Sequence, residues 1–224
     1  MDNQTNIRAV IFDMDGVLVD SEKLINTAAI TMFQEKGLIV QPEDFLPFVG
    51  AGEDRYIGGV AERYDFPLDG PAAKQRTYQI YLELAPSQLE VFPGTLKLLQ
   101  ACRQAGLLIA FASSADEIKV RANLQAIGLP RDFWGAIVVG EDALRKKPAP
   151  DGFLFAAEKL GVMPSECVVV EDAVNGIRAA KAAGMHCVAV ATSFSPDHLH
   201  EADVVRNSIA EISLSDLAPQ LGKS

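Results

Sequence analysis

Residues 8–21 read RAVIFDMDGVLVDS, an apolar run that stops at two carboxylates, Asp13 and Asp15. An uninterrupted apolar run of this length is typical of a strand buried on both faces of a parallel sheet, and such strands carry ligand-binding residues just beyond their carboxyl ends. Gly16 allows the chain to turn sharply at that point. Because two carboxylates that face one pocket suit a hard divalent cation, the pattern predicts a magnesium site.

Two other interpretations of the same residues compete with the magnesium site. Asp-x-Asp-Gly also occurs in surface turns, since aspartate and glycine both tolerate turn geometry, and the motif alone does not separate a turn from a metal site. A calcium loop of the EF-hand type needs glycine at its sixth position and glutamate at its twelfth. Counting from Asp13, Gly16 is fourth and Leu24 is twelfth, which excludes that loop.

The composition is that of an ordinary globular protein. The chain has 224 residues, of which 49% are apolar and 22% are charged, so it has room for one domain and a smaller one. Its formal net charge of -10 argues against binding to nucleic acid or to an anionic membrane, because both need a basic face. Any attraction for an anionic substrate must therefore be local.

The cysteines and the start of the chain predict a cytoplasmic protein. Cys102, Cys167 and Cys187 are odd in number and lie in apolar segments, so we expect them to be reduced core residues. Residues 1–6 are polar, and no segment approaches the ~18 uninterrupted apolar residues of a membrane span. Cytoplasmic residence is the expectation that follows.

The order of the predicted elements indicates an α/β protein with an inserted helical segment. Residues 21–90 show helical spacing, glycine-containing loops and no strong strand, and we expect them to form a helical cap domain. The remaining residues, 1–20 and 91–224, are expected to form a Rossmann-like, doubly wound parallel sheet core, because strands and helices alternate there. The elements predicted after the cap are helices over 95–105, 116–127, 151–160 and 173–183, and strands over 107–112, 136–139, 167–171 and 187–191.

Polar residues gather at the carboxyl ends of the later strands, on the sheet edge where Asp13 and Asp15 emerge. The candidates are Ser113, Ser114, Lys146, Lys147, Glu171 and Asp172. The two serines also allow a structural interpretation. Ser114 and Glu117 have the spacing of a capping box for the next helix, which leaves Ser113 available for function.

The lysines and the second acidic pair have structural interpretations as well. Lysines in loops are usually solvated, but Pro148 stiffens this loop and Asp151 can cap the following helix, so we expect Lys147 to point in a defined direction. Glu171 can be a strand-end charge and Asp172 a helix cap. Two adjacent acids at a strand end nevertheless favour metal binding.

Together these side chains suit phosphoryl transfer. A carboxylate nucleophile approaches an anionic phosphate monoester only if magnesium and lysine offset much of the charge on the phosphoryl oxygens. Asp13 is the candidate nucleophile, and its attack gives an aspartyl phosphate. Asp15 is placed to protonate the leaving oxygen and then to activate water.

The ordered set of motifs resembles the haloacid dehalogenase superfamily, and within it the β-phosphoglucomutase-like subgroup, in which a helical cap follows the first strand. The resemblance spans nearly the whole chain. The matching motifs, in the family's order, are Asp13-Met14-Asp15-Gly16, Ser113, Lys147 before Pro148-Ala149-Pro150-Asp151, and Glu171-Asp172.

The resemblance implies a role for each of these residues. Asp13 is the nucleophile and a Mg²⁺ ligand, and Asp15 is the acid and base and also binds the metal through its backbone carbonyl. Asp172 completes the metal site and Glu171 acts there indirectly or through water. Ser113 and Lys147 hold the transferring phosphoryl group.

The implied function is a magnesium-dependent phosphatase of small sugar phosphates, with a mobile cap that limits stray water. Dehalogenase and phosphonate-cleaving relatives lack an aspartate at the position of Asp15, so phosphate esters are expected. The alternative is a phosphosugar mutase, whose cap supplies a histidine and an arginine where this chain has Ile25 and Glu53. An alternative of another class is a ligand-sensing or partner-binding protein with little turnover.

The cap is expected to set the choice of substrate. The candidate substrate-binding residues are Gly50, Gly52 and Arg55 in the cap, and Ser114 in the core. The expected partner is a small phosphorylated metabolite, with neither nucleic acid nor membrane involved, and we expect a monomer.

Overall fold

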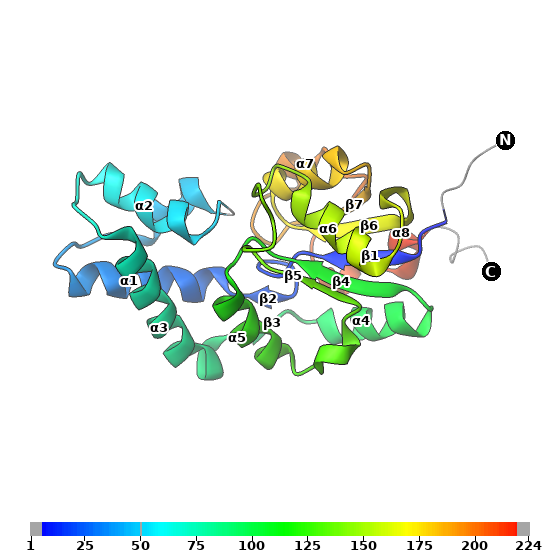
Figure 1. Cartoon of the computed structure of the whole chain (residues 1–224), viewed down its shortest axis with the longest axis horizontal. Coiled ribbons are helices and arrows are strands. Elements are labelled where there is room, and N and C mark those ends of the chain that lie inside the picture. The colour runs from blue at the N-terminus through cyan, green and yellow to red at the C-terminus, as the bar shows by residue number, and fades with distance from the viewer. Residues whose placement is uncertain (1–5, 50, 219–224) are drawn as a thin grey trace.

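The computed structural model describes residues 6–49 and 51–218 and contains a six-stranded parallel sheet in the order β5-β4-β1-β6-β7-β8 (Figure 1). The strands are β1 (Ala9–Phe12), β4 (Leu108–Ala112), β5 (Ala136–Val138), β6 (Cys167–Glu171), β7 (His186–Val190) and β8 (Val204–Arg206). Helices flank this sheet on both sides, so the predicted α/β class is confirmed.

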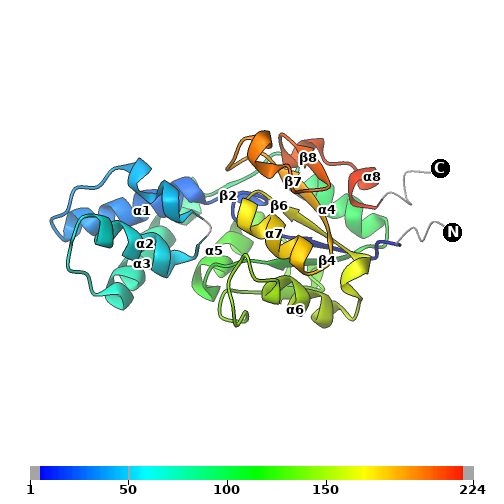
Figure 2. The same ribbon diagram turned by 90° about the horizontal axis from the view of Figure 1, so that it is seen from above.

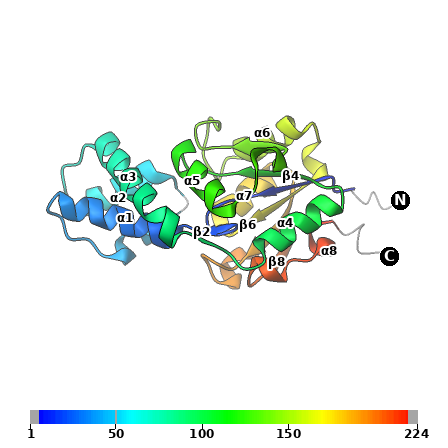
Figure 3. The ribbon, with the colours of Figure 1, turned by 90° about the horizontal axis from the view of Figure 1, so that it is seen from below.

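The apolar run that precedes Asp13 forms the strand β1 at the centre of the sheet. All four of its residues are fully buried, because successive side chains point to opposite faces and both faces are covered. Val10 and Phe12 pack in one core with helix α4 (Thr95–Gln104), seen over the sheet in Figure 3. Ala9 and Ile11 pack in a second core on the opposite face.

The second face is covered by α6 (Asp151–Leu160) and α7 (Val174–Ala182), which lie over the sheet in Figure 2. The helices α5 (Glu117–Ile127) and α8 (Leu214–Leu217) belong to the α4 side. The elements predicted after residue 91 agree with the structure to within one residue at each end. The short strand β8, on the edge of the sheet, was not predicted.

Four helical segments form a separate apolar core at one end of the molecule (Figures 1 and 2). They are α1 (Glu22–Glu35), the 3₁₀ helix η1 (Pro42–Phe48), α2 (Glu53–Arg63) and α3 (Gly70–Gln88). We call these segments the cap. The chain enters and leaves the cap through two short antiparallel strands, β2 (Val19–Asp20) and β3 (Glu90–Val91).

The cap also contacts the core directly through α3 and α5. The Tyr81 hydroxyl of α3 donates a 2.6 Å hydrogen bond to the Asn123 side-chain oxygen of α5, and Lys74 lies 2.8 Å from Asp116. The helix α5 therefore joins the cap to the sheet edge where the candidate site lies.

Three helix-cap interpretations from the sequence are wrong. The helix α5 begins at Glu117, whose backbone N–H donates to Glu141, so Ser114 and Glu117 form no capping box. Asp151 is the first residue of α6, and its carboxylate pairs with Arg145 at 2.8 Å instead of capping the helix. Asp172 precedes the N-cap residue of α7 and accepts a hydrogen bond from Ser193.

The three cysteines are free and buried, as predicted. Among the described residues, none of the helices has the length and apolar character that a membrane crossing requires.

Candidate active site

The register of the parallel strands brings together the predicted site residues that follow the ends of β1 and β6. Phe12 of β1 pairs with Phe111 of β4 and Val170 of β6, so the residue that follows in each strand reaches the same level of the sheet edge. Asp13 follows Phe12, and its backbone N–H donates to the Val170 carbonyl at 2.8 Å. Residues that are far apart in the sequence therefore lie side by side at this edge of the sheet.

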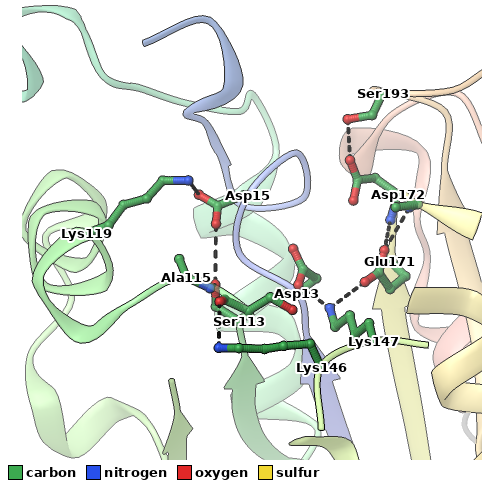
Figure 4. A network of polar contacts seen from close by, with 12 residues as sticks. Asp13, Asp15, Ser113, Ala115, Lys119, Lys146, Lys147, Glu171, Asp172 and Ser193 are labelled. Carbon is green, nitrogen blue, oxygen red and sulfur yellow. Dashed lines mark hydrogen bonds and ion pairs between the residues drawn. The ribbon is translucent and has the colours of Figure 1, made fainter. Parts of the chain in front are cut away.

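Lys147 lies between Asp13 and Glu171, as Figure 4 shows. Its ammonium group contacts Oδ1 of Asp13 and lies 2.5 Å from Oε1 of Glu171. The other Glu171 oxygen accepts 2.7 Å hydrogen bonds from the backbone N–H groups of Asp172 and Ala173. Both oxygens of Glu171 are therefore engaged, and this residue holds Lys147 against Asp13.

Asp172 completes a group of three buried carboxylates with Asp13 and Glu171. One oxygen of each lies within 4.8 Å of the others. Asp172 accepts a hydrogen bond from the Ser193 hydroxyl and lies against Gly16, where an added Cβ would be 2.0 Å from Oδ2. Gly16 also has a φ of +79°, so both its backbone and its lack of a side chain are needed here.

The charges of this cluster do not balance. Burial is the largest influence on the pKa of Asp13 and raises it to about 7, with Lys147 opposing the shift and Glu171 adding to it. Burial and the charges of Glu171 and Asp13 raise the pKa of Asp172 well above its usual value. One ammonium group is too little positive charge for three buried carboxylates, so the donor set fits a hard divalent cation.

Asp15 lies in a different environment, where hydrogen-bond donors surround its carboxylate. Oδ1 accepts from the Ser21 hydroxyl and from Asn123 at 3.0 Å, and lies 3.1 Å from the Lys119 ammonium. Burial acts to raise the pKa of Asp15, but the charge of Lys119 and these hydrogen bonds outweigh it and lower the pKa. The two aspartates of the motif thus differ in their proton affinity.

Ser113 lies beside Asp15, and Lys146 supports the same edge from below in Figure 4. The Ser113 hydroxyl donates to Oδ2 of Asp15 at 3.3 Å and accepts from the backbone N–H of Ala115 at 3.0 Å. The Lys146 ammonium donates to the carbonyls of Gly140 and Ser114 at 2.5 and 3.2 Å. Lys146 therefore braces two loops, whereas its neighbour Lys147 faces the carboxylates.

A cavity of about 140 Å³ lies between the sheet edge and the cap. Asp13, Asp15, Lys147, Glu171 and Asp172 line its core side. Its wall contains two of the four predicted substrate-binding residues, Ser114 from the core and Gly52 from the cap.

The other two substrate-binding candidates are not brought to this cavity. Arg55 projects elsewhere, with half of its side chain exposed, and pairs with Glu62 at 2.7 Å. It also stacks on the Phe48 ring, 4.9 Å from the ring centroid. Gly50 lies outside the described residues.

Sequence reasoning missed four residues that touch the candidate residues or line the cavity, namely Lys119, Ser21, Asn123 and Ser193. It named Glu53 only as the residue at the position of the mutase arginine, and Glu53 lines the cavity as well. Lys119 and Asn123 are four residues apart on α5, so they share one helix face. That spacing was visible in the sequence. A charged residue on an amphipathic helix is nevertheless usually expected to face solvent, so the burial of Lys119 was not predicted.

Comparison with known proteins links this arrangement to one family of hydrolases. The family model of haloacid dehalogenase-like hydrolases matches residues 7–184. Hexitol phosphatase A from Escherichia coli (strain K12) is 31% identical over 214 residues, which cover 93% of this chain and 94% of that protein.

The protein SUPPRESSOR OF QUENCHING 1, chloroplastic, from Arabidopsis thaliana is 47% identical over 221 residues. The match covers 96% of this chain, which spans only 21% of the length of that relative.

Among solved structures, a CbbY variant from Rhodobacter sphaeroides in complex with xylulose-(1,5)bisphosphate superimposes with a TM-score of 0.85. It is 27% identical, and the match covers 95% of this chain and 99% of that chain.

Proposed function

Because this chain belongs to the haloacid dehalogenase-like hydrolases, we propose that it hydrolyses small phosphate monoesters, with sugar phosphates and related polyol phosphates as substrates. The observation that carries the proposal is the convergence of Asp13, Lys147 and Asp172 on one cavity. Hexitol phosphatase A and the CbbY complex with a sugar bisphosphate support this substrate class.

The proposed cofactor is Mg²⁺, held by Asp13 and Asp172. Glu171 takes part indirectly, because Lys147 and two backbone N–H groups already occupy its oxygens. The backbone carbonyl of Asp15 is a further proposed ligand. When bound, Mg²⁺ offsets the negative charge of the phosphoryl oxygens and of the carboxylates around them.

In the proposed first step, a carboxylate oxygen of Asp13 attacks phosphorus and the bond to the ester oxygen breaks. Lys147 keeps Asp13 in place and, with Ser113, binds the phosphoryl oxygens. Asp15 gives its proton to the leaving oxygen, which departs as an alcohol. The product on the protein is an aspartyl phosphate.

In the second step, water attacks the phosphorus of the aspartyl phosphate. Asp15, now ionised, takes a proton from that water, and the bond between phosphorus and the Asp13 oxygen breaks. Phosphate is released and Asp13 is regenerated. The donors on both of its oxygens orient the Asp15 carboxylate and favour its ionised form, so they support the role of base, and Asp15 must take up the proton for the leaving oxygen before the first step.

The cap is proposed to open for exchange of substrate and product and to close during the chemistry. We retain residues 21–90 as the proposed cap domain, and the antiparallel pair of β2 and β3, through which the chain enters and leaves the cap, supports these limits. A monomer located in the cytoplasm remains part of the proposal.

The test is phosphate release from a panel of monoesters, measured with Mg²⁺, with a chelator and with the variant Asp13→Asn. We expect release only from the unaltered protein with Mg²⁺. Asp132→Asn, which changes an exposed aspartate, is the matched control and should keep full activity. Equal phosphate release under all conditions, or none from any ester, would contradict the proposal.

A further inference from the structure

Glu53 is a cap residue that faces the cavity, and the phosphatase mechanism above gives it no role. It is the first residue of α2, directly after Gly52, which has a φ of +84°. Only 7% of its surface is exposed, and it lines the same cavity as the carboxylate cluster. Burial of a glutamate at this place needs a physical reason, because an ionised carboxylate loses its hydration there.

The two oxygens of Glu53 differ in their surroundings. Oε1 lies 3.3 Å from the ammonium of Lys119, which also contacts Asp15 at 3.1 Å. Oε2 is buried and has no hydrogen-bond partner. Leaving a buried acceptor unsatisfied is costly, so this oxygen is a ready acceptor for a donor that enters the cavity.

The Tyr78 hydroxyl is an internal competitor for this oxygen. It is also buried without a well-formed hydrogen bond, and burial, the charge of Glu53 and a weak hydrogen-bonding interaction with Glu53 raise its pKa. Tyr78 does not line the cavity, whereas Glu53 does. The last torsion of a glutamate side chain is soft, so a small rotation of the carboxylate, in which both oxygens move together, can present Oε2 to a donor in the cavity.

The charges on the cap side of the cavity are unfavourable for a second phosphate. Glu22 and Glu53 both line the cavity there, and Lys119, the lysine of the cavity wall that acts on both of them, already pairs with Asp15. The other lysine of the cavity wall, Lys147, pairs with Asp13 and Glu171 at the phosphoryl end. Among the described residues of the wall, no arginine is present to bind a second anion.

We infer that Glu53 determines specificity: its Oε2 atom accepts a hydrogen bond from a hydroxyl group of the substrate, and its charge disfavours a second phosphate. The substrate class is therefore a monophosphate of a polyhydroxylated molecule that carries no other anion. The inference rests on the proposed phosphatase function and narrows it, since a sugar bisphosphate is the ligand in the similar CbbY structure.

The test compares three substrates: glucitol 6-phosphate, fructose 1,6-bisphosphate and p-nitrophenyl phosphate, whose leaving group has no hydroxyl to donate. Glu53→Met removes the acceptor and should lower kcat/KM for glucitol 6-phosphate by about 10- to 100-fold, while kcat/KM for p-nitrophenyl phosphate changes less than about threefold. Activity towards p-nitrophenyl phosphate also shows that the variant is folded.

Glu53→Gln removes the charge and keeps the size of the side chain. It should raise kcat/KM for the bisphosphate relative to glucitol 6-phosphate by about tenfold or more. The matched control is Glu62→Gln, which removes the same charge from an exposed site on α2. This control should leave the ratio unchanged.

The outcomes separate the two proposals. If the unaltered protein hydrolyses none of the three esters, the phosphatase function fails and the inference with it. If it hydrolyses them but Glu53→Met slows glucitol 6-phosphate and p-nitrophenyl phosphate equally, or neither, only the inference is overturned. The same holds if Tyr78→Phe reproduces the loss on glucitol 6-phosphate, because Tyr78 is then the partner of Oε2.

Discussion

Gly16 and Asp172 are in such close contact that a Cβ atom on Gly16 would lie 2.0 Å from Oδ2 of Asp172 and 3.0 Å from the Ser193 hydroxyl oxygen. Gly16 belongs to the turn after β1, and Asp172 follows β6. The glycine of the Asp-x-Asp-Gly motif therefore serves two purposes: it adopts a positive φ, and it leaves room for a proposed metal ligand from another strand.

The first prediction concerns this contact. Gly16→Ala should displace the Asp172 carboxylate, weaken the affinity for Mg²⁺ by about 10- to 100-fold and lower kcat/KM at limiting Mg²⁺ accordingly. The measurement is a titration of phosphatase activity with Mg²⁺.

Gly37→Ala is the control for that experiment. Gly37 has a φ of +85°, but an added Cβ there meets nothing within 4 Å. Gly37→Ala should therefore introduce backbone strain without a steric clash: it should lower the free energy of unfolding by about 1 kcal/mol and leave the dependence of activity on Mg²⁺ unchanged. Equal behaviour of the two variants would show that strain, and not the contact with Asp172, is responsible.

The second prediction separates two adjacent lysines. Lys147→Met removes the ammonium that contacts Asp13 and Glu171, so kcat should fall by about 10²- to 10³-fold. Lys146→Met removes two hydrogen bonds to backbone carbonyls and should cost about 1–3 kcal/mol of stability while kcat stays within about tenfold. Steady-state kinetics and urea unfolding of both variants give the comparison, and a larger loss of kcat in Lys146→Met would refute the assignment.

The third prediction concerns stability and pH in the absence of metal. A carboxyl group whose pKa is higher in the folded state binds its proton more tightly there, so stability is lost as the pH rises through the folded-state value. The pKa values of Asp13 and Glu22 are both raised to about 7. For Glu22, burial and the charges of Asp15 and Glu53 raise the pKa, and the charge of Lys119 opposes the shift. The free energy of unfolding of the metal-free protein should therefore fall between pH 5 and 7.5.

A shift of one pKa unit corresponds to about 1.4 kcal/mol, so the fall should amount to a few kcal/mol. Saturating Mg²⁺ should reduce this pH dependence, because a bound cation stabilises the ionised carboxylates, and Asp13→Asn should reduce it in the absence of metal. Thermal unfolding across this pH range measures the effect. A midpoint that rises with pH in the presence of chelator would show that the carboxylates are not held as described.

The fourth prediction concerns Lys119, whose side chain is 3% exposed and lies between Asp15 and Glu53. Lys119→Met leaves both carboxylates without their cation and should cost about 3–5 kcal/mol in the free energy of unfolding. Lys181→Met, which breaks a partly exposed pair with Asp203, should cost at most about 1 kcal/mol.

Combining Lys119→Met with Glu53→Gln should recover part of the lost stability, since one of the two stranded charges is then removed. Urea unfolding of the unaltered protein, the two single variants and the double variant completes the double-mutant cycle. Strict additivity of the two changes would mean that Lys119 and Glu53 do not interact.

The helices and strands of the core could be predicted because their periodicity is local. The helices and parallel strands after residue 91 have apolar residues at a clear period, and glycines follow several of the helices. The pair formed by β2 and β3 escaped prediction because two residues per strand are too few for any period to show. The strand β8 has only three partly buried residues and was missed for the same reason.

The sequence by itself determined that acidic, hydroxyl and ammonium side chains follow the carboxyl ends of parallel strands. Because the carboxyl ends of parallel strands lie at one edge of the sheet, Asp13, Lys147 and Asp172 could be predicted as one group. Only the tertiary structure decided that Lys119 turns away from solvent and binds Asp15 and Glu53. Those contacts join a core helix, a strand end and the cap, and no local pattern encodes them, because they depend on how two separately packed apolar cores lie against each other.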